Sequence, residues 1–381
     1  MKKNVRSVAK AWHVWLGLSL GLLFCLMGLS GSLILYRDAI EAALRPQWMA
    51  VSSARPASVL DEADANIRRR WPDAVPSRIT FPRVAGEPYQ YQIRVDGKPI
   101  HAYFDATTGE ILGTWELPWL DGIAGFHQNL LLPPPGRQLA GLIGIALFLS
   151  GVSGLSIWLF RNPTWRGVLR INWRAALNNS RWNRFSFDLH RSTGLVANAF
   201  LLILSFTGIC LGFPDTFRSF AEAVTATSGA RPARITVAQT AMKQPIDMYV
   251  QSALGAIPGG VIRELRFPQA ANSPATARLW RQGDYRDEGS NRVSLDPATA
   301  RVVAVDAAAT WSPARKLASI PAPIHYAEWG GPIVKVLWCL TGLTPSILFV
   351  SGFVFWLKGR RARGKFATAA SADASRVLVP R

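Results

Sequence analysis

The stretch VWLGLSLGLLFCLMGLSGSLILY, residues 14–36, has 23 positions and not one charged side chain. Three further stretches of similar length are also free of charge, at residues 138–160, 192–214 and 336–357. About 20 apolar residues in a helix cross the ~30 Å hydrocarbon core of a bilayer. Helices buried in a soluble core are the alternative, but four such runs in one soluble domain would be unusual. The sequence therefore predicts a membrane protein with four transmembrane helices.

The charge of the chain is distributed unevenly along it. In 381 residues there are 43 Lys and Arg against 24 Asp and Glu, and hydrophobic residues make up 49%. This apolar content excludes a disordered chain, and a count of three cysteines excludes a disulfide scaffold. Most of the excess positive charge lies in residues 1–13, 161–191 and 358–381, which the positive-inside rule places in the cytoplasm. A lipid bilayer thus explains the charge, and no nucleic-acid partner is needed.

The spans divide the chain into segments on the two sides of a bacterial inner membrane, with both termini in the cytoplasm. Alternating runs at residues 89–95 and 101–104, and an amphipathic pattern at 58–71, predict that the external segments fold. We therefore expect an all-α bundle of four transmembrane helices with two small α+β periplasmic domains. In the first half, the predicted order is a transmembrane helix at 14–36, a periplasmic domain at 37–126, and an interfacial segment with the second transmembrane helix at 127–160. A basic cytoplasmic loop at 161–191 leads to the second half, which has a third helix at 192–214, a second periplasmic domain at 215–324, and an interfacial segment with the fourth helix at 325–357. A cytoplasmic tail follows at 358–381, and its last four residues resemble the remnant of a thrombin-cleaved tag.

The two halves of the sequence match each other at constant offsets. Before the spans, His13 matches His190, and His127 matches His325. Inside the spans the matched pairs of small residues are Ser30-Gly31 with Thr207-Gly208, and Ser153-Gly154 with Ser351-Gly352. Each half is a span, an external domain and a span, so the two copies run in the same direction. A twofold axis along the membrane normal is the expected relation between them.

The four matched histidines are the candidate functional residues. A twofold axis would bring His13 to face His190 at the cytoplasmic side, and His127 to face His325 at the periplasmic side. A planar group on the axis would then receive one imidazole from each half, which suits bis-histidine ligation of haem iron. No C-x-x-C-H motif is present, so we expect two non-covalent, b-type haems. An interfacial histidine with a hydrogen bond, or a copper or zinc site, is the alternative at each position.

Other residues would make room for the haems or bind their propionates. Four glycines would allow the helices to approach closely: Gly17, Gly194, Gly144 and Gly342. Haem propionates need cations near the membrane surface, and the matched candidates on the outside are Arg137 and Lys335. Lys10 and Arg191 are weaker candidates on the inside. The fifth histidine, His101, has no matched partner and lies in a predicted strand, so we expect it to be structural.

Two short stretches carry a resemblance to known proteins. Residues 104–110, FDATTGE, and 295–301, LDPATAR, resemble the PepSY domain. The four-span arrangement, with the segment His127-Gln-Asn-Leu before a span, resembles the PepSY-associated membrane-helix family over nearly the whole chain. That family includes iron-regulated inner-membrane proteins, and within it the chain is most similar to ferrioxamine-type siderophore reductases, which implies a haem protein. The second stretch has Ala300 where the first has Gly109, so the second external domain is expected to be less regular.

These residues and this resemblance together predict a haem-dependent ferric-siderophore reductase. An electron from a cytoplasmic donor or a quinol would enter at His13 and His190, pass to His127 and His325, and reduce a ferric hydroxamate siderophore in the periplasm. Hydroxamate oxygens suit Fe(III) better than Fe(II), so reduction would release the iron. The alternative is a membrane-anchored, non-enzymatic PepSY regulator of a peptidase. A transporter is disfavoured because the spans carry no charged residue.

Overall fold

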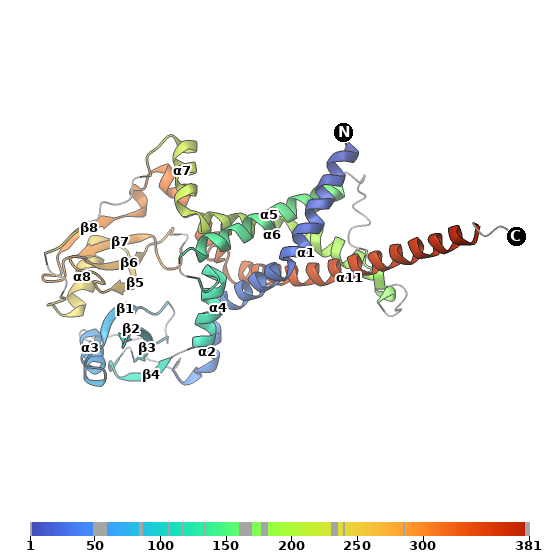
Figure 1. Ribbon diagram of the computed structural model, residues 1–381. Coiled ribbons are helices and arrows are strands. Elements are labelled where there is room, and N and C mark those ends of the chain that lie inside the picture. The colour runs from blue at the N-terminus through green and yellow to red at the C-terminus, as the bar shows by residue number, and fades with distance from the viewer. Residues whose placement is uncertain are drawn as a thin grey trace. The chain divides into compact units, whose positions relative to one another are not determined.

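The computed structural model describes residues 2–48, 59–83, 87–105, 107–115, 117–132, 134–159, 170–176, 182–229, 235–238, 241–284 and 286–377. The chain divides into two compact units, whose elements are labelled in Figure 1. The helical unit comprises Met1–Leu35, Gly122–Pro214 and Ile324–Arg381, and the sheet unit comprises Tyr36–Asp121 and Asp215–Pro323. Each unit therefore draws on both halves of the chain. The tag-like residues 378–381 and much of the predicted loop at 161–191 lie outside the described residues.

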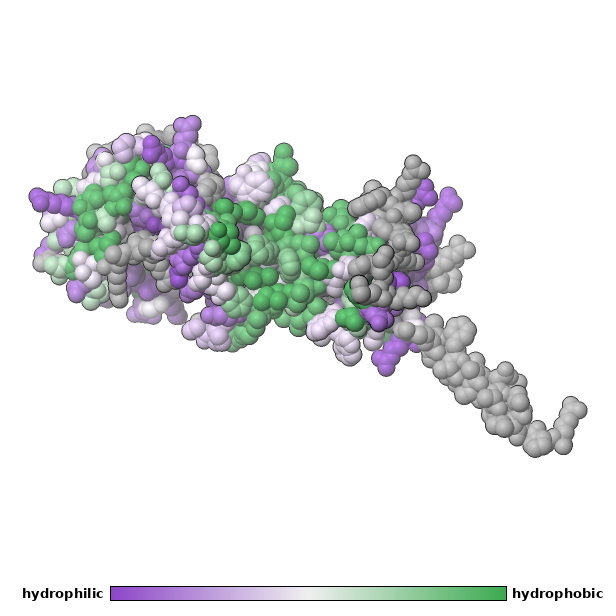
Figure 2. All heavy atoms as spheres, turned by 90° about the horizontal axis from the view of Figure 1, so that it is seen from above, coloured by the Kyte–Doolittle hydropathy of each residue, from purple (hydrophilic) through white to green (hydrophobic). Residues whose placement is uncertain are grey.

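Four long helices form the helical unit: α1 (Lys2–Ile34), α5 (Gly136–Leu159), α6 (Trp182–Gly212) and α11 (Gly331–Val377). All four are long and apolar enough to cross a membrane. Many of their large apolar side chains face outward, since Leu22 is 61%, Val196 58% and Val350 60% exposed. Figure 2 shows apolar residues gathered over the middle of this unit. Lipid chains can cover such a surface and water cannot do so cheaply, so the prediction of four spans is confirmed.

The four helices form a ring, because α1 and α6 each pack against both α5 and α11. The helices that match in sequence, α1 with α6 and α5 with α11, therefore stand at opposite corners. Two of the contacts close on glycines. A Cβ added to Gly212 would lie 2.5 Å from the Cα of Gly141, and one added to Gly28 would overlap the carbonyl oxygen of Gly342. Any larger residue at these places would push the helices apart.

The sheet unit contains two sets of elements in the same order, helices followed by four strands. The strands predicted at 89–95 and 101–104 lie in β2 and β3, and the helix predicted at 58–71 is α3. The first set is α2 (Arg37–Leu44), η1 (Pro46–Trp48), α3 (Val59–Arg70), β1 (Val75–Thr80), β2 (Tyr89–Val95), β3 (Lys98–Phe104) and β4 (Ile111–Trp115), followed by α4 (Pro118–Asn129), which runs on into the helical unit. The second set is α7 (Pro214–Thr225), α8 (Ile246–Ala256), β5 (Val261–Arg266), β6 (Ala275–Trp280), β7 (Asn291–Leu295), β8 (Val302–Asp306), η5 (Ala308–Thr310) and α9 (Pro313–Ser319), followed by α10 (Pro321–His325). One further short helix, η3 (Trp173–Ala175), belongs to neither set and lies between α5 and α6 in the chain.

All eight strands belong to one antiparallel sheet of order β4-β3-β2-β1-β5-β6-β7-β8. The two sets meet where β1 pairs with β5, with Ile79 opposite Leu265. The sequence predicts two separate α+β domains, and the structure differs by joining them in one sheet. The physical reason is that each four-stranded half alone would leave β1 or β5 as an edge with unpaired backbone groups. The alternation of side chains shows which face of a strand is buried but not which edge is paired, so it could not reveal this junction.

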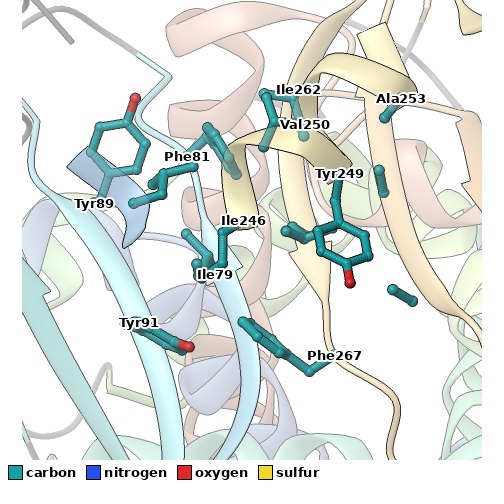
Figure 3. Close-up of a cluster of buried hydrophobic side chains, with 14 of the residues drawn as sticks. Ile79, Phe81, Tyr89, Tyr91, Ile246, Tyr249, Val250, Ala253, Ile262 and Phe267 are labelled. Atoms are coloured by element: carbon teal, nitrogen blue, oxygen red, sulfur yellow. The ribbon is translucent and has the colours of Figure 1, made fainter. Parts of the chain in front are cut away.

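One face of the sheet is apolar and packs against α3 and α8. Figure 3 shows part of this cluster, with side chains of α8 beside those of β1, β2 and β5. Ile79, Tyr91 and Leu265 on the strands are fully buried, as are Tyr249 and Val250 on α8. Full burial of an apolar side chain of this size contributes about 1.5–3 kcal/mol to stability. The core is continuous across the β1–β5 junction and includes residues from both external segments. The sheet unit is therefore one folded body with a single core.

The stretches at 104–110 and 295–301 form the same turn. Asp105 and Asp296 each accept two backbone N–H bonds from the residues two and three positions later. The turn then needs a left-handed residue, which is Gly109 in the first copy (φ 70°) and Ala300 in the second (φ 57°). The two turns therefore have the same form although Ala300 replaces the glycine, because the surrounding hydrogen bonds hold Ala300 in a conformation that alanine rarely adopts.

We expect Gly212→Ala to lower the unfolding temperature, because the new methyl group meets the backbone of Gly141 rather than a movable side chain. Overpacking of this kind typically costs about 1–3 kcal/mol. The matched control is Gly359→Ala on α11, where an added Cβ would meet nothing within 4 Å. Thermal unfolding in detergent, followed by tryptophan fluorescence, measures both variants. Equal unfolding temperatures would contradict the helix contact described.

Candidate functional site

The four matched histidines form two pairs inside the helical unit. His13 of α1 and His190 of α6 have ring centres 5.9 Å apart and ring planes at 82°. His127 of α4 and His325 of α10 have ring centres 6.2 Å apart and ring planes at 39°. These are the two pairs that the repeat in the sequence predicts. The first pair meets across the centre of the bundle, because α1 and α6 stand at opposite corners.

The separation within each pair matches what an ion between two imidazoles requires. A metal–imidazole bond is about 2 Å long and the ring centre lies roughly 1 Å beyond the nitrogen, so ring centres on opposite sides of one ion stand about 6 Å apart. The observed separations of 5.9 and 6.2 Å are close to this value. Rings in plain van der Waals contact also have centres about 4.5–7 Å apart. The ring separation alone therefore does not distinguish a metal-binding pair from two rings in simple contact. The protonation of the ring nitrogens must distinguish them.

Each histidine is held through its Nδ1 atom by an oxygen of another helix. The distances from Nδ1 to the oxygen are 3.0 Å from His13 to Ser150 O on α5, 3.0 Å from His127 to Met27 O on α1, 2.9 Å from His190 to Leu348 O on α11, and 2.9 Å from His325 to Thr207 Oγ1 on α6. A hydrogen bond from the second ring nitrogen to a carbonyl is the usual companion of metal-ligating histidine, because it fixes the orientation of the ring.

A serine or threonine beside each bond determines where the imidazole proton lies. The hydroxyl of Ser30 donates to Met27 O at 3.0 Å, so its oxygen is left to accept, and His127 Nδ1 lies 3.1 Å from it. Because both neighbours of Nδ1 are acceptors, Nδ1 carries the proton and Nε2 keeps its lone pair. The same arrangement occurs at His13 with Ser153 and at His190 with Ser351. At His325 the acceptor is the Thr207 hydroxyl itself, which donates its own proton to Leu204 O. All four Nε2 atoms are thus in the form that can bind a metal ion.

A glycine follows each of these hydroxyl residues and lets the imidazole lie against the helix. The distances from a Cβ built on the glycine to the imidazole Cε1 are 2.7 Å at Gly31 with His127, 3.0 Å at Gly154 with His13, 3.0 Å at Gly352 with His190, and 3.4 Å at Gly208 with His325. Three of these values are shorter than side chains normally allow. The four Ser/Thr-Gly pairs are visible in the sequence as matched positions, but only the structure shows that they contact the histidines.

The arrangement is reciprocal within each half of the chain. Helix α1 carries His13 and, 17 residues later, the Ser30 that holds His127, and α6 carries His190 and, 17 residues later, the Thr207 that holds His325. At about 1.5 Å per residue, this spacing places the two pairs roughly 25 Å apart along the helices. That length is most of the ~30 Å hydrocarbon core. The two pairs therefore lie near opposite ends of the membrane-spanning bundle.

Two predicted glycines lie close in sequence to the first pair. Gly17 and Gly194 follow His13 and His190 by one turn, on the same helix faces. A Cβ at Gly17 would meet nothing within 4 Å, and one at Gly194 would meet a single side-chain atom at 3.4 Å. The prediction of close helix approach is correct for Gly342, whereas Gly17 leaves room instead. A flat group between the two imidazoles would need room of this kind beside its ligands.

The second pair is neutral at physiological pH. Burial lowers the pKa of His127, and burial together with the nearby His127 ring lowers the pKa of His325 to about 3. Neutral imidazole is the form that binds metal ions. Burial also lowers the pKa of His101 to about 4, but the Nδ1 of His101 bonds the Gln90 amide at 2.8 Å in the sheet unit. This contact agrees with the structural role that the sequence predicts for His101.

The predicted propionate contacts lie at the expected ends of helices. Arg137 is exposed at the start of α5 and its Nε donates to Leu211 O at 2.7 Å. Lys335 lies near the start of α11. Their role toward propionates stays a prediction. The weaker candidate Arg191 lies 3.5 Å from the buried carboxylate of Asp188, so that part of its charge is already compensated.

Within the described residues, no group of three or more His, Cys, Asp or Glu side chains is placed to hold a metal ion. Zinc sites normally use three or four protein ligands in tetrahedral geometry. Two facing imidazoles with free Nε2 atoms instead suit an ion whose remaining ligands come from a prosthetic group, as in haem. The residues present therefore fit bis-histidine haem better than the copper or zinc alternative.

Comparison with known proteins gives one clear match. The family described as PepSY-associated TM region matches residues 10–359, which is most of the chain and includes all four paired histidines. No curated protein sequence matches the chain.

We expect Gly31→Ala to destabilise the helical unit, because the new methyl group would lie 2.7 Å from the His127 ring. The cost should be about 1–3 kcal/mol. Gly208→Ala is the matched control, since the distance to His325 there is an ordinary 3.4 Å. A double-mutant cycle with His127→Ala, measured by denaturant unfolding, should show that removing the ring recovers most of the loss. Additive effects of the two substitutions would rule out the contact.

Proposed function

The chain belongs to the PepSY-associated TM region family, and on this premise we propose that it is a dihaem electron-transfer protein of the bacterial inner membrane, which reduces a ferric hydroxamate siderophore. One b-type haem would be held by His13 and His190, and the other by His127 and His325. The observation that carries the proposal is the two imidazole pairs with ring centres about 6 Å apart and protonated Nδ1 atoms.

The chain supplies its ligands in a prepared state. Each imidazole is neutral at Nε2, and its orientation is fixed from another helix before anything binds. Haem bound at these positions would supply one-electron transfer. Rings that are already fixed need not turn during the reaction, and such preorganisation lowers the reorganisation cost of moving charge. The helices that carry the pairs are apolar enough to cross a membrane, and an apolar surrounding would limit the access of water to the bound groups.

The positions of the pairs favour transfer across the bilayer. The pair of His13 and His190 would accept electrons from a cytoplasmic reductase or a quinol. The pair of His127 and His325, roughly 25 Å further along α1 and α6, would deliver them on the periplasmic side. One electron converts Fe(III) to Fe(II) in the bound chelate. The softer, less charged ion binds hydroxamate oxygens more weakly, so the iron leaves its ligand.

The proposed pairing of the histidines also has a consequence for how the two halves of the chain arose. We infer that they are copies of one unit, because matching helices stand at opposite corners and the two external sets share one order of elements. The identical turns at Asp105 and Asp296 support PepSY-like character in both external segments. A duplicated chain would supply one histidine from each copy near each surface of the membrane. A pair of axial ligands on a twofold axis needs such an arrangement.

We expect the purified protein to show a Soret band that shifts on reduction, and His127→Ala to retain one of two haems. Haem per protein, measured as the pyridine haemochrome, gives the count. The control is His101→Gln, which changes the one histidine outside the pairs and should retain both haems. If His127→Ala lost both haems or neither, the pairing would be wrong. A protein that never takes up haem would favour the non-enzymatic PepSY regulator.

The substrate can be tested by stopped flow. We expect the dithionite-reduced protein to be reoxidised by a ferric hydroxamate siderophore, with Fe(II) appearing in a ferrozine trap. The gallium(III) complex of the same siderophore is the control, because it has the same shape and charge but accepts no electron. Failure of every ferric hydroxamate to reoxidise the protein would remove the reductase assignment and leave the haem sites standing.

A further inference from the structure

We propose that the sheet unit contains a binding site for a small, multiply charged oxyanion, such as a phosphate or a polycarboxylate. The site is a hollow of about 220 Å³. Its lining includes Arg278, Arg286, Arg292, Arg315, Ser290 and Trp311. Pockets for drug-sized ligands measure about 300–1,000 Å³, so this one fits a small anion or the charged end of a larger molecule. The proposal does not rest on the haem sites, which lie in the other unit.

Three strands place charge in a row beside this hollow. Arg278 on β6 lies directly opposite Arg292 on β7, and Arg292 lies opposite Asp306 on β8. Like charges directly opposite each other on neighbouring strands destabilise a sheet. The direct Arg278–Arg292 neighbourhood is therefore unfavourable by itself. An anion held between the two guanidinium groups would replace repulsion by charge-assisted hydrogen bonds.

Two of the four arginines that line the hollow form ion pairs with acidic residues. The compensated arginines and their partners are Arg278 with Glu288 and Arg315 with Asp306. Arg286 and Arg292 have no carboxylate within 4 Å in the part of the chain that the structure describes. These two guanidinium groups thus lack an ion-pair partner, while the nearby Asp284 carboxylate accepts from the Ser290 N–H and the Asn291 side chain. Guanidinium groups present paired N–H donors that match the two oxygens of a carboxylate or phosphate.

Two buried polar atoms at the hollow also lack hydrogen-bond partners among the described residues. They are the Nε of Arg286 and the Oγ of Ser290, and Ser290 is only 8% exposed. Buried polar groups are costly to leave unpaired, and in native proteins such a group usually has an ion, a ligand or a water as its partner. Both groups can donate a hydrogen bond. An oxyanion in the hollow would satisfy both at once.

The walls of the hollow are fixed before binding. The side chain of Asn291 donates to Asp284 at 3.0 Å and accepts from the Ala308 N–H at 3.0 Å, which ties the β6–β7 loop to the segment after β8. The guanidinium of Arg315 lies 4.2 Å over the ring of Trp311. Little ordering is therefore needed when an anion enters, and the cost of binding is correspondingly small.

Isothermal titration calorimetry on the full chain in detergent tests the site, with inorganic phosphate and citrate as probes and chloride holding the ionic strength constant. We expect saturable binding with a Kd of about 1 mM or tighter. Arg286→Gln should weaken it at least tenfold, and Ser290→Ala several-fold. Arg94→Gln is the matched control, because Arg94 is an exposed arginine on β2 of the same sheet, away from the hollow. Unchanged unfolding temperatures of the variants exclude loss of the fold as the cause.

Two results would overturn the proposal: no saturable heat with either probe up to about 10 mM, ten times the expected Kd, or equal weakening by Arg286→Gln and Arg94→Gln. Nanodiscs containing phosphatidylglycerol separate the two sources of phosphate. If they displace citrate, the natural occupant is a lipid headgroup, and if they do not, it is a free anion. The His127→Ala variant should bind both probes as the parent protein does, so a failure of the haem proposal leaves this test intact.

Discussion

The hydrogen bond from an imidazole Nδ1–H to an oxygen on a neighbouring helix, made four times, is the constraint on which the helical unit depends. It fixes the tautomer, because the adjacent hydroxyl oxygen can only accept. It also joins α1 to α4 and α5, and α6 to α10 and α11. The same contacts therefore orient the four imidazoles and hold the helices of the bundle together. At Gly31, Gly154 and Gly352, the glycine after the hydroxyl residue serves the same bond, since a side chain there would press on the ring.

The matched halves do not produce identical sites. The ring planes stand at 82° in one pair and 39° in the other. His325 has the hydroxyl of Thr207 as its close partner, where the other three histidines have backbone carbonyls. Ligand orientation and hydrogen bonding to the ligand are among the properties by which a protein tunes a bound haem. The two pairs therefore differ in ring orientation and in hydrogen-bond partner, although their positions match in the sequence.

Much of this architecture could be predicted from the sequence. Uncharged runs give the four spans, and the matched positions of His13, His190, His127 and His325 give both pairs, because a repeat implies an axis. The contacts of Ser30 and its equivalents could not be predicted, although their matches are plain, because they depend on how each helix is rotated. The β1–β5 junction and the arginine row at Arg278 and Arg292 depend on strand edges and register, which periodicity does not specify.

The junction of β1 with β5 also determines the order in which the protein can be completed. Strand β1 ends at Thr80 and β5 begins at Val261, so about 180 residues, including α5 and α6, are synthesised between them. At typical rates of translation this takes roughly 10–40 seconds. Strands β2, β3 and β4 are made early in this interval, so the edge of the four-stranded half at β1 stays open for most of it. The pairing of β1 with β5 therefore forms only after α5 and α6 have been synthesised, and until then β1 has backbone groups without their strand partner.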